Sequence, residues 1–413
     1  MQRSFLFGLV IVCLLSLSGC GRESGASRST TGFQDGTSEP ALAAGSDGKV
    51  YLAYVQHQSK ESADVRLARF GPDGKPAGEN VRVNPEQGAA RSWYGDPPVV
   101  KAGAGGTVYV AWTAKSSTGG DLYLSVSRDA GETFEAPVKV SDDVRASPGL
   151  HSLAIGPNGE IYVAWLDERS SHAPDEMQHA AMNGHSSVAA VKASLAADDS
   201  QTHKMHSGGG EADRELYFAV STDGGRSFGA NQRIASDVCP CCKTSMAVGS
   251  DGKLYVSWRQ VLPNSYRHIA VAESTDSGRT FTEPLIVSDD QWQIDACPVS
   301  GASLNTSANG LDVYWYTAGS AGEPGLYSAH SADGRSFGER QLVSGSCSGG
   351  MPAKAADYVV YASAGDVTVQ RGDAVVRKLT AAANPTAVTA GDRLYVAYVS
   401  KSGPAGSISV EEF

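Results

Sequence analysis

The sequence predicts an all-β protein built from repeated small sheets, and three observations support this fold class. Glycine makes up 47 of the 413 residues, and long helical periodicities are hard to find. A tight turn followed by an alternating, aromatic-centred strand recurs along the chain, as in GSDGKVYLAY (45–54) and GPNGEIYVAW (156–165). A small sheet of this kind can bury its faces only against neighbouring sheets. The repeat therefore predicts a β-propeller of four-stranded blades.

The strand repeat also gives the expected number of blades. Seven units start near residues 40, 96, 149, 241, 298, 351 and 384, so we expect seven blades. The last unit ends at Phe413 without an obvious outer strand, and we expect the segment before Glu39 to supply that strand and close the ring. The third unit is longer than the others, because residues 170–212 are inserted between its second and third strands.

A second motif follows the strands in four of the units. Its copies begin at Ser127, Ser221, Ser274 and Ser331, and the last copy is one residue shorter. The motif resembles the Asp box, or BNR repeat, of the sialidase superfamily, S-x-D-x-G-x-T/S-W/F. The resemblance implies that the aspartate closes a turn between the third and fourth strands, that the glycine permits the turn, and that the phenylalanine packs between sheets. The residues in these roles are Asp129, Gly131, Phe134, Asp223, Gly225, Phe228, Asp276, Gly278, Phe281, Asp333 and Phe337. Sialidases usually have six blades, so a six-bladed ring is the alternative to seven.

The first residues of the chain resemble a bacterial lipoprotein signal. Arg3 precedes an apolar stretch that is too short to span a bilayer permanently, and Leu17-Ser18-Gly19-Cys20 resembles a lipobox. The resemblance implies a signal peptide over residues 1–19 and a lipid on Cys20. The small, polar residues that follow make 20–38 the expected tether, and the strand repeat makes 39–413 a single propeller domain. The expected location is the cell envelope, facing the periplasm or the exterior. Gly21, in place of an aspartate, favours the outer membrane.

The charge of the chain limits its partners. The formal net charge is −11, which argues against nucleic acid or anionic lipid as a ligand. We therefore expect contact with a membrane through the lipid anchor only. An acidic surface is compatible with cations and with neutral glycans.

The cysteines of the predicted propeller all fall in links between blades, which share one face of a propeller with the loops between second and third strands. They are Cys239, Cys241, Cys242, Cys297 and Cys347. Disulfides are one interpretation, with Cys242–Cys297 across adjacent blades as the first pairing expected, and metal ligation is the other. Five is an odd number, so at least one thiol is expected to stay free or to act as a ligand.

The insert after the third unit's second strand opens on the same face and is rich in histidine and methionine. Imidazole and thioether groups together suit copper, zinc or another soft transition metal. The candidate ligands are His172, Met177, His179, Met182, His185, His203, Met205 and His206. The alternative is a surface loop of incidental composition. By contrast, His151 and Met246, near the starts of inner strands, are expected to be packing residues.

For catalysis, the sialidase resemblance implies three arginines that bind the substrate carboxylate, a Tyr–Glu nucleophile pair and an aspartate as the acid/base. The Arg-Ile-Pro motif that carries the first arginine is absent from FQDGTSEPALAA (33–44). Another glycosidase would need two facing carboxylates, such as Asp167 or Glu168 with Asp295. The candidate residues on the expected functional face are Arg259, Arg169, Asp167, Glu168 and Asp295.

Three functional hypotheses follow from these patterns. The first is binding of a glycan, a protein or a soft metal at the loop face of a cell-envelope lipoprotein. The second is a glycoside hydrolase of the exo-sialidase type. The third is a structural scaffold, in which the cysteines only form disulfides between the segments that join the blades.

Overall fold

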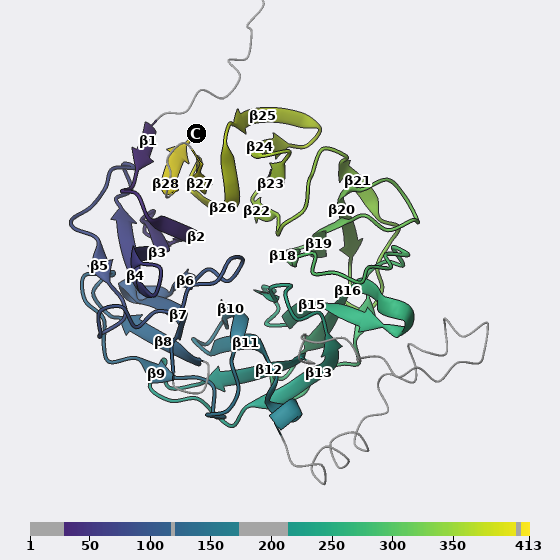
Figure 1. Cartoon of the computed structure of the whole chain (residues 1–413), viewed down its shortest axis with the longest axis horizontal. Coiled ribbons are helices and arrows are strands. Elements are labelled where there is room, and N and C mark those ends of the chain that lie inside the picture. Colours follow the sequence, from purple (N-terminus) through teal and green to yellow (C-terminus); the bar gives the residue numbers. More distant parts are fainter. Residues whose placement is uncertain (1–28, 117–119, 173–213, 402–405) are drawn as a thin grey trace, which may run out of the picture.

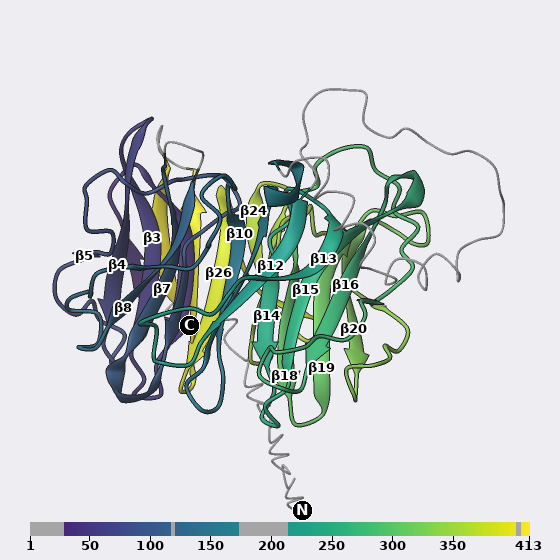
Figure 2. The ribbon, with the colours of Figure 1, turned by 90° about the horizontal axis from the view of Figure 1, so that it is seen from below.

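The computed structural model describes residues 29–116, 120–172, 214–401 and 406–413. The predicted signal peptide, Cys20 and residues 173–212 of the insert rich in histidine and methionine lie outside these residues. The described strands form five four-stranded sheets and one eight-stranded sheet, arranged around a central axis (Figure 1). Figure 2 shows the same sheets from the side, with their strands running roughly along that axis. The predicted all-β architecture of four-stranded antiparallel blades is confirmed.

The sheets follow one another around the ring in chain order, and apart from the last sheet, whose outer strand comes from the N-terminal segment, each begins with its innermost strand (Figure 1). The first sheet contains β2 (Thr37–Ala44), β3 (Val50–Ser59), β4 (Ser62–Phe70) and β5 (Val81–Arg82). The second contains β6 (Val99–Ala102), β7 (Val108–Ala114), β8 (Asp121–Ser127) and β9 (Val138–Lys139). The eight-stranded sheet contains β10 (Gly149–Ile155), β11 (Ile161–Asp167), β12 (Arg214–Ser221), β13 (Gln232–Val238), β14 (Ser245–Val248), β15 (Leu254–Leu262), β16 (Tyr266–Ser274) and β17 (Leu285–Ile286).

Three further sheets complete the ring. One contains β18 (Ala302–Ser307), β19 (Gly310–Thr317), β20 (Gly325–Ser331) and β21 (Gln341–Ser344). The next contains β22 (Ala353–Ala355), β23 (Tyr358–Ser363), β24 (Asp366–Arg371) and β25 (Ala374–Leu379). The last contains β26 (Ala382–Ala390), β27 (Arg393–Ser400), β28 (Ser407–Glu412) and, as its outer strand, β1 (Ser29–Gly32). The eight-stranded sheet has two four-stranded parts joined by the pair Val238–Gln260, so the described strands divide into seven groups of four.

The ring is closed by β1, which pairs antiparallel with β28. The segment before Glu39 thus supplies the outer strand of the last sheet, as the sequence suggested. The tether predicted over residues 20–38 is correspondingly too long, because residues 29–32 form β1 and β2 already begins at Thr37. Pairing satisfies the backbone N–H and C=O groups that β1 turns toward β28, which a free tether would leave to water.

The core lies between neighbouring sheets. Trp112, Trp165, Trp258 and Trp315 occupy equivalent places on second strands and are at most 2% exposed. One apolar cluster joins Val50 and Phe70 of the first sheet to Tyr395 and Ile408 of the last, so packing as well as pairing closes the ring. Three short 3-10 helices, η1 (Ala104–Gly106), η2 (Arg169–His172) and η3 (Pro263–Ser265), lie among the described residues. In the described parts of the chain no helix is long and apolar enough to cross a bilayer.

The Asp boxes form the turns that the resemblance implied. In the first copy, Asp129 Oδ1 accepts the N–H groups of Glu132 (3.0 Å) and Thr133 (2.9 Å), and Asp129 Oδ2 accepts the Thr133 hydroxyl. Gly131 has a φ of +82°, which favours glycine. Phe134 packs against the apolar cluster between the first two sheets. Burial would raise the pKa of Asp129, but the hydrogen bonds from Thr133 and its neighbours lower it to about 2.

We expect Asp129→Ala to lower the free energy of unfolding by about 1 kcal/mol, because the turn loses the acceptor of several hydrogen bonds while remaining largely solvated. Urea unfolding measures the change. Asp129→Asn keeps one acceptor oxygen and should lose less. An alanine variant as stable as the unaltered protein would show that the box does not stabilise the turn.

Candidate functional site

A cavity of about 680 Å³ lies on the axis of the ring. Each innermost strand, β2, β6, β10, β14, β18, β22 and β26, contributes residues to its lining. The links that lead into these strands contribute Tyr94, Gly95, Pro97, Pro98, Pro298, Val299, Gly301 and residues 348–352, and loops between second and third strands contribute Gly365 and Lys401. The cavity is therefore the mouth of the central channel on the face where the links lie, which is the face expected to carry the ligand.

Three inner strands carry a bulge at this mouth. The register of β2 shifts between Ser38 and Ala41, and β10 and β26 shift at equivalent places. Glu39, Leu150 and Asn384, one in each bulge, have φ values of +54°, +55° and +50°. Side chains other than glycine adopt this region at a cost of about 1 kcal/mol or more, and such strain is often found at functional sites. A bulge re-aims the side chain it carries, and the bulge in β2 brings Glu39 to the cavity.

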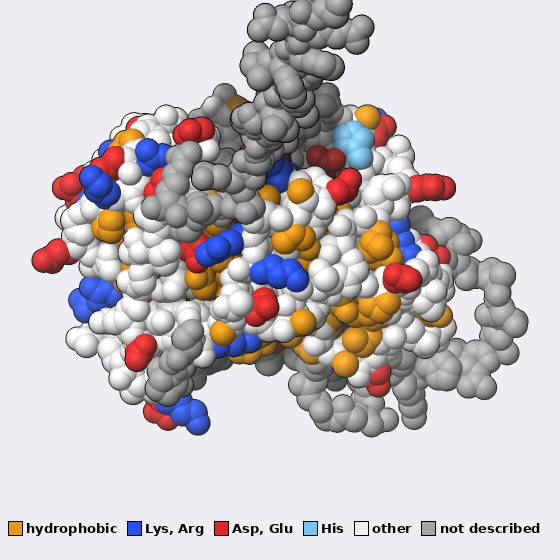
Figure 3. Space-filling model, turned by 90° about the horizontal axis from the view of Figure 1, so that it is seen from above, with side chains coloured by type: hydrophobic (Ala, Val, Ile, Leu, Met, Phe, Trp, Pro, Cys, Tyr) orange, Lys and Arg blue, Asp and Glu red, His pale blue; other side chains and the backbone are white. Residues whose placement is uncertain are grey.

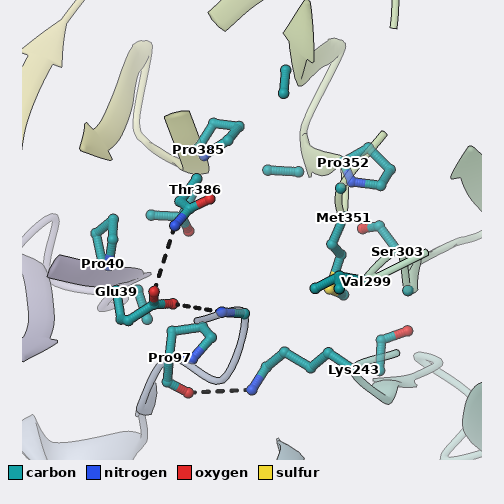
Figure 4. Close-up of a pocket in the computed structure, with 18 of the residues that line it drawn as sticks. Glu39, Pro40, Pro97, Lys243, Val299, Ser303, Met351, Pro352, Pro385 and Thr386 are labelled. Atoms are coloured by element: carbon teal, nitrogen blue, oxygen red, sulfur yellow. Dashed lines mark hydrogen bonds between the residues drawn. The ribbon is translucent and has the colours of Figure 1, made fainter. Parts of the chain in front are cut away.

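Glu39 is a buried carboxyl with few compensating contacts. Its side chain is 5% exposed, and its oxygens accept the Gly95 N–H at 3.3 Å and the Asn384 amide at 3.5 Å (Figure 4). Burial, with a smaller contribution from the charge of Asp96, raises the pKa of Glu39 to about 7. A carboxyl with this pKa is a proton donor or acceptor near neutral pH.

The pKa of Asp96 is shifted in the opposite direction. Its Oδ1 lies 3.2 Å from His151 Nδ1 and 3.4 Å from Lys243 Nζ, and all three side chains are largely buried. Burial would raise the pKa of Asp96, but His151 and Lys243 hold it well below its usual range. Burial lowers the pKa of Lys243, whose Nζ also donates to the carbonyl of Pro97 at 3.2 Å. His151, expected to be a packing residue, is fully buried, and its other ring nitrogen contacts the carbonyl of Ala111.

The charged residues that line the cavity are mostly cations. They are Lys101, Lys243, Lys354 and Lys401, against Glu39 and Asp366. The chain as a whole has a net charge of −11, so the local balance is opposite in sign. On the outer wall shown in Figure 3, by contrast, acidic and basic side chains are intermixed. The cavity is therefore the part of this acidic molecule suited to an anion.

Arg259, predicted as a carboxylate-binding residue, is fully buried away from the cavity. Its Nε and Nη2 donate to the carbonyl of Ser300 at 3.0 and 2.8 Å, and Nη2 also donates to that of Tyr316 at 3.0 Å. The guanidinium carbon lies 4.8 Å from the centroid of the Trp292 ring. Its hydrogen bonds thus go to backbone carbonyls.

Arg169 and Asp167, two further candidates, form an ion pair inside the third blade. Arg169 Nη2 lies 2.6 Å from Asp167 Oδ2, and the guanidinium stacks over Tyr217 with its carbon 3.9 Å from the ring centroid. Asp167 also accepts the indole N–H of Trp165 at 2.9 Å. The same arrangement recurs in the sheet β18–β21, where Asp290 accepts the Trp315 N–H and pairs with Arg340, which stacks over Tyr327. Recurrence in two blades indicates a structural unit.

The remaining catalytic candidates do not line the cavity either. Glu168 accepts the N–H of Ser147 at 2.8 Å and lies 3.5 Å from Arg214, while Asp295 is exposed in the link before β18. Asp167 is fully buried, so it cannot face Asp295 across a substrate. A Tyr–Glu pair of the kind that sialidases use as a nucleophile does occur, since the Tyr217 hydroxyl donates to Glu215 at 2.8 Å. However, Tyr217 is packed between blades, and burial raises its pKa, so its hydroxyl stays protonated.

The disulfide joins Cys241 to Cys297. The predicted pairing Cys242–Cys297 is therefore wrong by one residue, because Cys242 is turned inward, with its sulfur 3.3 Å from that of Cys239. Cys347 is separate from this cluster and packs with Leu326, Val359 and Tyr361, so the five thiols do not all meet. The sulfurs of Cys239, Cys241 and Cys242 lie within 4.8 Å of one another. With Cys241 bonded, two thiols remain, fewer than the three or four protein ligands that zinc usually has.

The candidate metal ligands of the insert are largely beyond what the structure describes. Met177, His179, Met182, His185, His203, Met205 and His206 lie outside the described residues, and His172 ends η2.

The residues that the sequence interpretation missed are Glu39, Asp96 and Lys243. Each lies in a link or at the start of an inner strand, which is where the rule that placed the cysteines also places them. The strand repeat thus predicts that these residues lie on the link face, but no motif distinguishes them from other charged residues there.

The fold, but not the family, is identified by comparison with known proteins. No protein-family model matches the chain, and no curated protein matches it. Among solved structures, an ulvan lyase, PL25, has a TM-score of 0.52 at 11% identity, over 92% of this chain and 95% of that one. A Trypanosoma rangeli sialidase has a TM-score of 0.50 at 13% identity, over 94% of this chain and 58% of that one. A puromycin hydrolase has a TM-score of 0.52 at 15% identity, over 91% and 51%. Likeness at such identities shows the fold, which is a sialidase-like β-propeller.

Proposed function

We propose that this protein binds an acidic saccharide at the mouth of its central channel. The observation that carries the proposal is the cavity on the ring axis, where lysines prevail over acids in a chain of net charge −11. A cavity with low-dielectric walls focuses the field of such charges and raises the local concentration of a ligand of opposite sign. The sequence is compatible with a glycan, a protein or a soft metal as the ligand, and the lysines favour an anionic glycan.

The donors in the cavity suit a carboxylate or sulfate. The ammonium group of Lys243 has three N–H donors, and Asp96 and Pro97 accept from it, so one donor remains for a ligand. Lys243 reaches into the cavity from the side opposite Glu39 and Pro40 (Figure 4). A hydrogen bond between an ammonium and an anionic oxygen is about twice as strong as one between neutral groups.

The remaining lining suits a sugar ring. The hydroxyls of Ser303 and Thr386 line the cavity, together with the apolar rings of Pro40, Pro352 and Pro385 (Figure 4). Its volume of about 680 Å³ lies within the range typical of small-molecule sites. Hydroxyls can bond to sugar hydroxyls, and the proline rings can pack on sugar C–H groups.

Two of the similar structures support this ligand class. The PL25 ulvan lyase was solved bound to GlcA(1-4)Rha3S, and the Trypanosoma rangeli sialidase belongs to enzymes named for a sialic acid. Uronate, sulfated rhamnose and sialic acid are all anionic sugars. A shared fold does not by itself identify the ligand of this chain, but an anionic sugar is also the ligand class that the lysines of the cavity favour.

Calorimetric titration with a sulfated, uronate-containing oligosaccharide tests the proposal. We expect Lys243→Gln to weaken binding at least about tenfold, or about 1.4 kcal/mol, because the anion loses a charged donor. Lys378→Gln, at an exposed position of β25, is the matched control and should bind like the unaltered protein. A neutral oligosaccharide of the same length should bind more weakly than the acidic one. Equal affinities for the two sugars, or equal effects of the two variants, would refute the proposal.

A second candidate function is cleavage of the bound glycan, which retains the glycoside hydrolase alternative with different residues. Glu39 and Asp96 are neighbouring carboxyls whose environments move their pKa values in opposite directions, as in acid/base pairs of enzymes. Glu39 would be the proton donor. Glu39→Gln should then keep binding and abolish release of reducing ends or unsaturated products. No release by the unaltered protein would leave binding as the function.

We also propose that the protein is a cell-envelope lipoprotein anchored through Cys20. The support is the lipobox-like stretch before that residue. Metabolic labelling with palmitate in a bacterial host tests it, since the label should be lost in Cys20→Ser. A protein that carries no label would contradict the anchor.

A further inference from the structure

Four sulfur atoms are gathered where the link before β14 meets the link before β18. Cys239 and Cys242 are both fully buried thiols, with their sulfurs 3.3 Å apart. The sulfur of Cys239 is also 3.8 Å from that of Cys241, which is bonded to Cys297. A thiol pair thus lies in van der Waals contact with a disulfide, while Cys297 is the exposed member of the four.

Two buried arginines give this cluster a positive environment. Arg267 Nη1 donates to the sulfur of Cys239 at 3.1 Å, and Arg259 Nη1 donates to the carbonyl of Arg267 at 3.4 Å. Both residues are at most 6% exposed, and within the described ranges neither pairs with a carboxylate at ion-pair distance. Burying an uncompensated cation is costly. A thiolate at Cys239 would supply a negative charge beside them.

The two thiols are not equivalent. The hydrogen bond between the Cys239 and Cys242 sulfurs, with a further contribution from Arg267, lowers the pKa of Cys239 to about 6. Burial raises the pKa of Cys242, so that thiol keeps its proton. Since the thiolate is the attacking species in thiol–disulfide exchange, Cys239, which also contacts the sulfur of Cys241 at 3.8 Å, is the better placed of the two to attack the disulfide.

We propose that Cys239, Cys241, Cys242 and Cys297 form a thiol–disulfide exchange centre, in which the buried Cys239/Cys242 pair exchanges with the Cys241–Cys297 disulfide. The exposed Cys297 connects this centre to an external thiol or disulfide. The geometry that carries the proposal is the contact of the Cys239 sulfur with both Cys241 and Cys242, together with its hydrogen bond from Arg267. The centre is separate from the saccharide site and does not depend on the proposed ligand.

The exchange is balanced within the chain. The Cys239 thiolate attacks the sulfur of Cys241, which forms a Cys239–Cys241 bond and releases Cys297 as a thiolate. Cys242 gives its proton to that thiolate and attacks the sulfur of Cys239, which forms Cys239–Cys242 and releases Cys241 as a thiolate. One disulfide breaks and one forms, so Cys239 and Cys242 lose the two electrons that Cys241 and Cys297 gain.

Trapping the disulfides tests the exchange. The full chain is equilibrated in mixtures of reduced and oxidised glutathione, quenched with N-ethylmaleimide, and mapped by peptide mass spectrometry. Among chains with one disulfide in this cluster, we expect both Cys241–Cys297 and Cys239–Cys242 in the unaltered protein. Finding Cys241–Cys297 alone at every glutathione ratio would overturn the proposal, and this result requires no variant that might fail to fold.

Variants then separate the roles of the four cysteines. Cys239→Ser should show no exchange and retain Cys241–Cys297, whereas Cys242→Ser should accumulate Cys239–Cys241 with Cys297 labelled. In Cys297→Ser, formation of Cys239–Cys242 should slow at least about tenfold, because the exposed sulfur is lost. Cys347→Ser is the matched control, since its thiol is also buried but lies in another cluster. Equal rates in Cys297→Ser and the control would refute the connecting role of Cys297.

Discussion

Arg259→Ala is expected to lower the free energy of unfolding by about 4 kcal/mol. The side chain is fully buried, and its removal leaves a cavity against Trp292. It also leaves the carbonyls of Ser300 and Tyr316 without their donor. A large buried side chain replaced by alanine costs about 2–5 kcal/mol, and each unsatisfied buried carbonyl adds to this. Urea unfolding followed by circular dichroism measures the loss.

The same variant decides between the two roles considered for Arg259. Arg371→Ala removes an arginine whose ion pair with Asp357 is exposed, so it should change stability by less than about 0.5 kcal/mol. A structural Arg259 predicts a large loss of stability relative to this control. An Arg259→Ala protein that is as stable as the control but no longer binds an acidic sugar would instead make Arg259 a ligand-binding residue.

Glu39→Gln is expected to stabilise the protein at pH 8 by about 3 kcal/mol and to change it little at pH 4. The pKa of Glu39 is raised from 4.5 to about 7 in the folded protein. Between these values the folded state holds a proton that the unfolded state has released, so stability falls as the pH rises from 4.5 through 7. Each pKa unit corresponds to about 1.4 kcal/mol, and glutamine resembles the protonated carboxyl.

Unfolding at pH 4, 6 and 8 measures this dependence. Glu283→Gln, at an exposed position, is the control and should show no such gain. If Glu39→Gln changed stability by the same amount at pH 4 and pH 8, the carboxyl would not titrate in the folded state near neutral pH. A destabilising ionisable group kept in a cavity is typical of a functional site, where stability is sacrificed for binding or chemistry.

The fold was predictable because short, repeated sequence patterns determine it. Each strand repeat contains its own turn and alternation, and each Asp box forms its hydrogen bonds within a few residues, as Asp129 does with Thr133. The closing strand was also predictable, because the last unit lacked an outer strand that β1 supplies. Such features need no knowledge of distant contacts.

The site was not predictable in the same way. Asp96 meets His151 and Lys243 only because the links before β6 and β14 converge on β10, and Glu39 faces the cavity because of a bulge in β2. The pairing of Cys241 in place of Cys242 depends on the direction of a side chain within a turn, which the spacing of cysteines does not determine. Arg259 and Arg169 are candidates because sialidases bind their substrate with arginines. In the structure, Arg259 is buried and bonds to backbone carbonyls, and Arg169 forms an ion pair with Asp167, so both have structural roles.

A crystal structure of the protein with a sulfated, uronate-containing oligosaccharide tests the central proposal most directly. The proposal predicts the sugar in the cavity on the ring axis, with an anionic oxygen within hydrogen-bond distance of Lys243 Nζ and the carboxyl of Glu39 beside it. A sugar bound on the outer wall or at the Asp-box turns, with the cavity free, would contradict it.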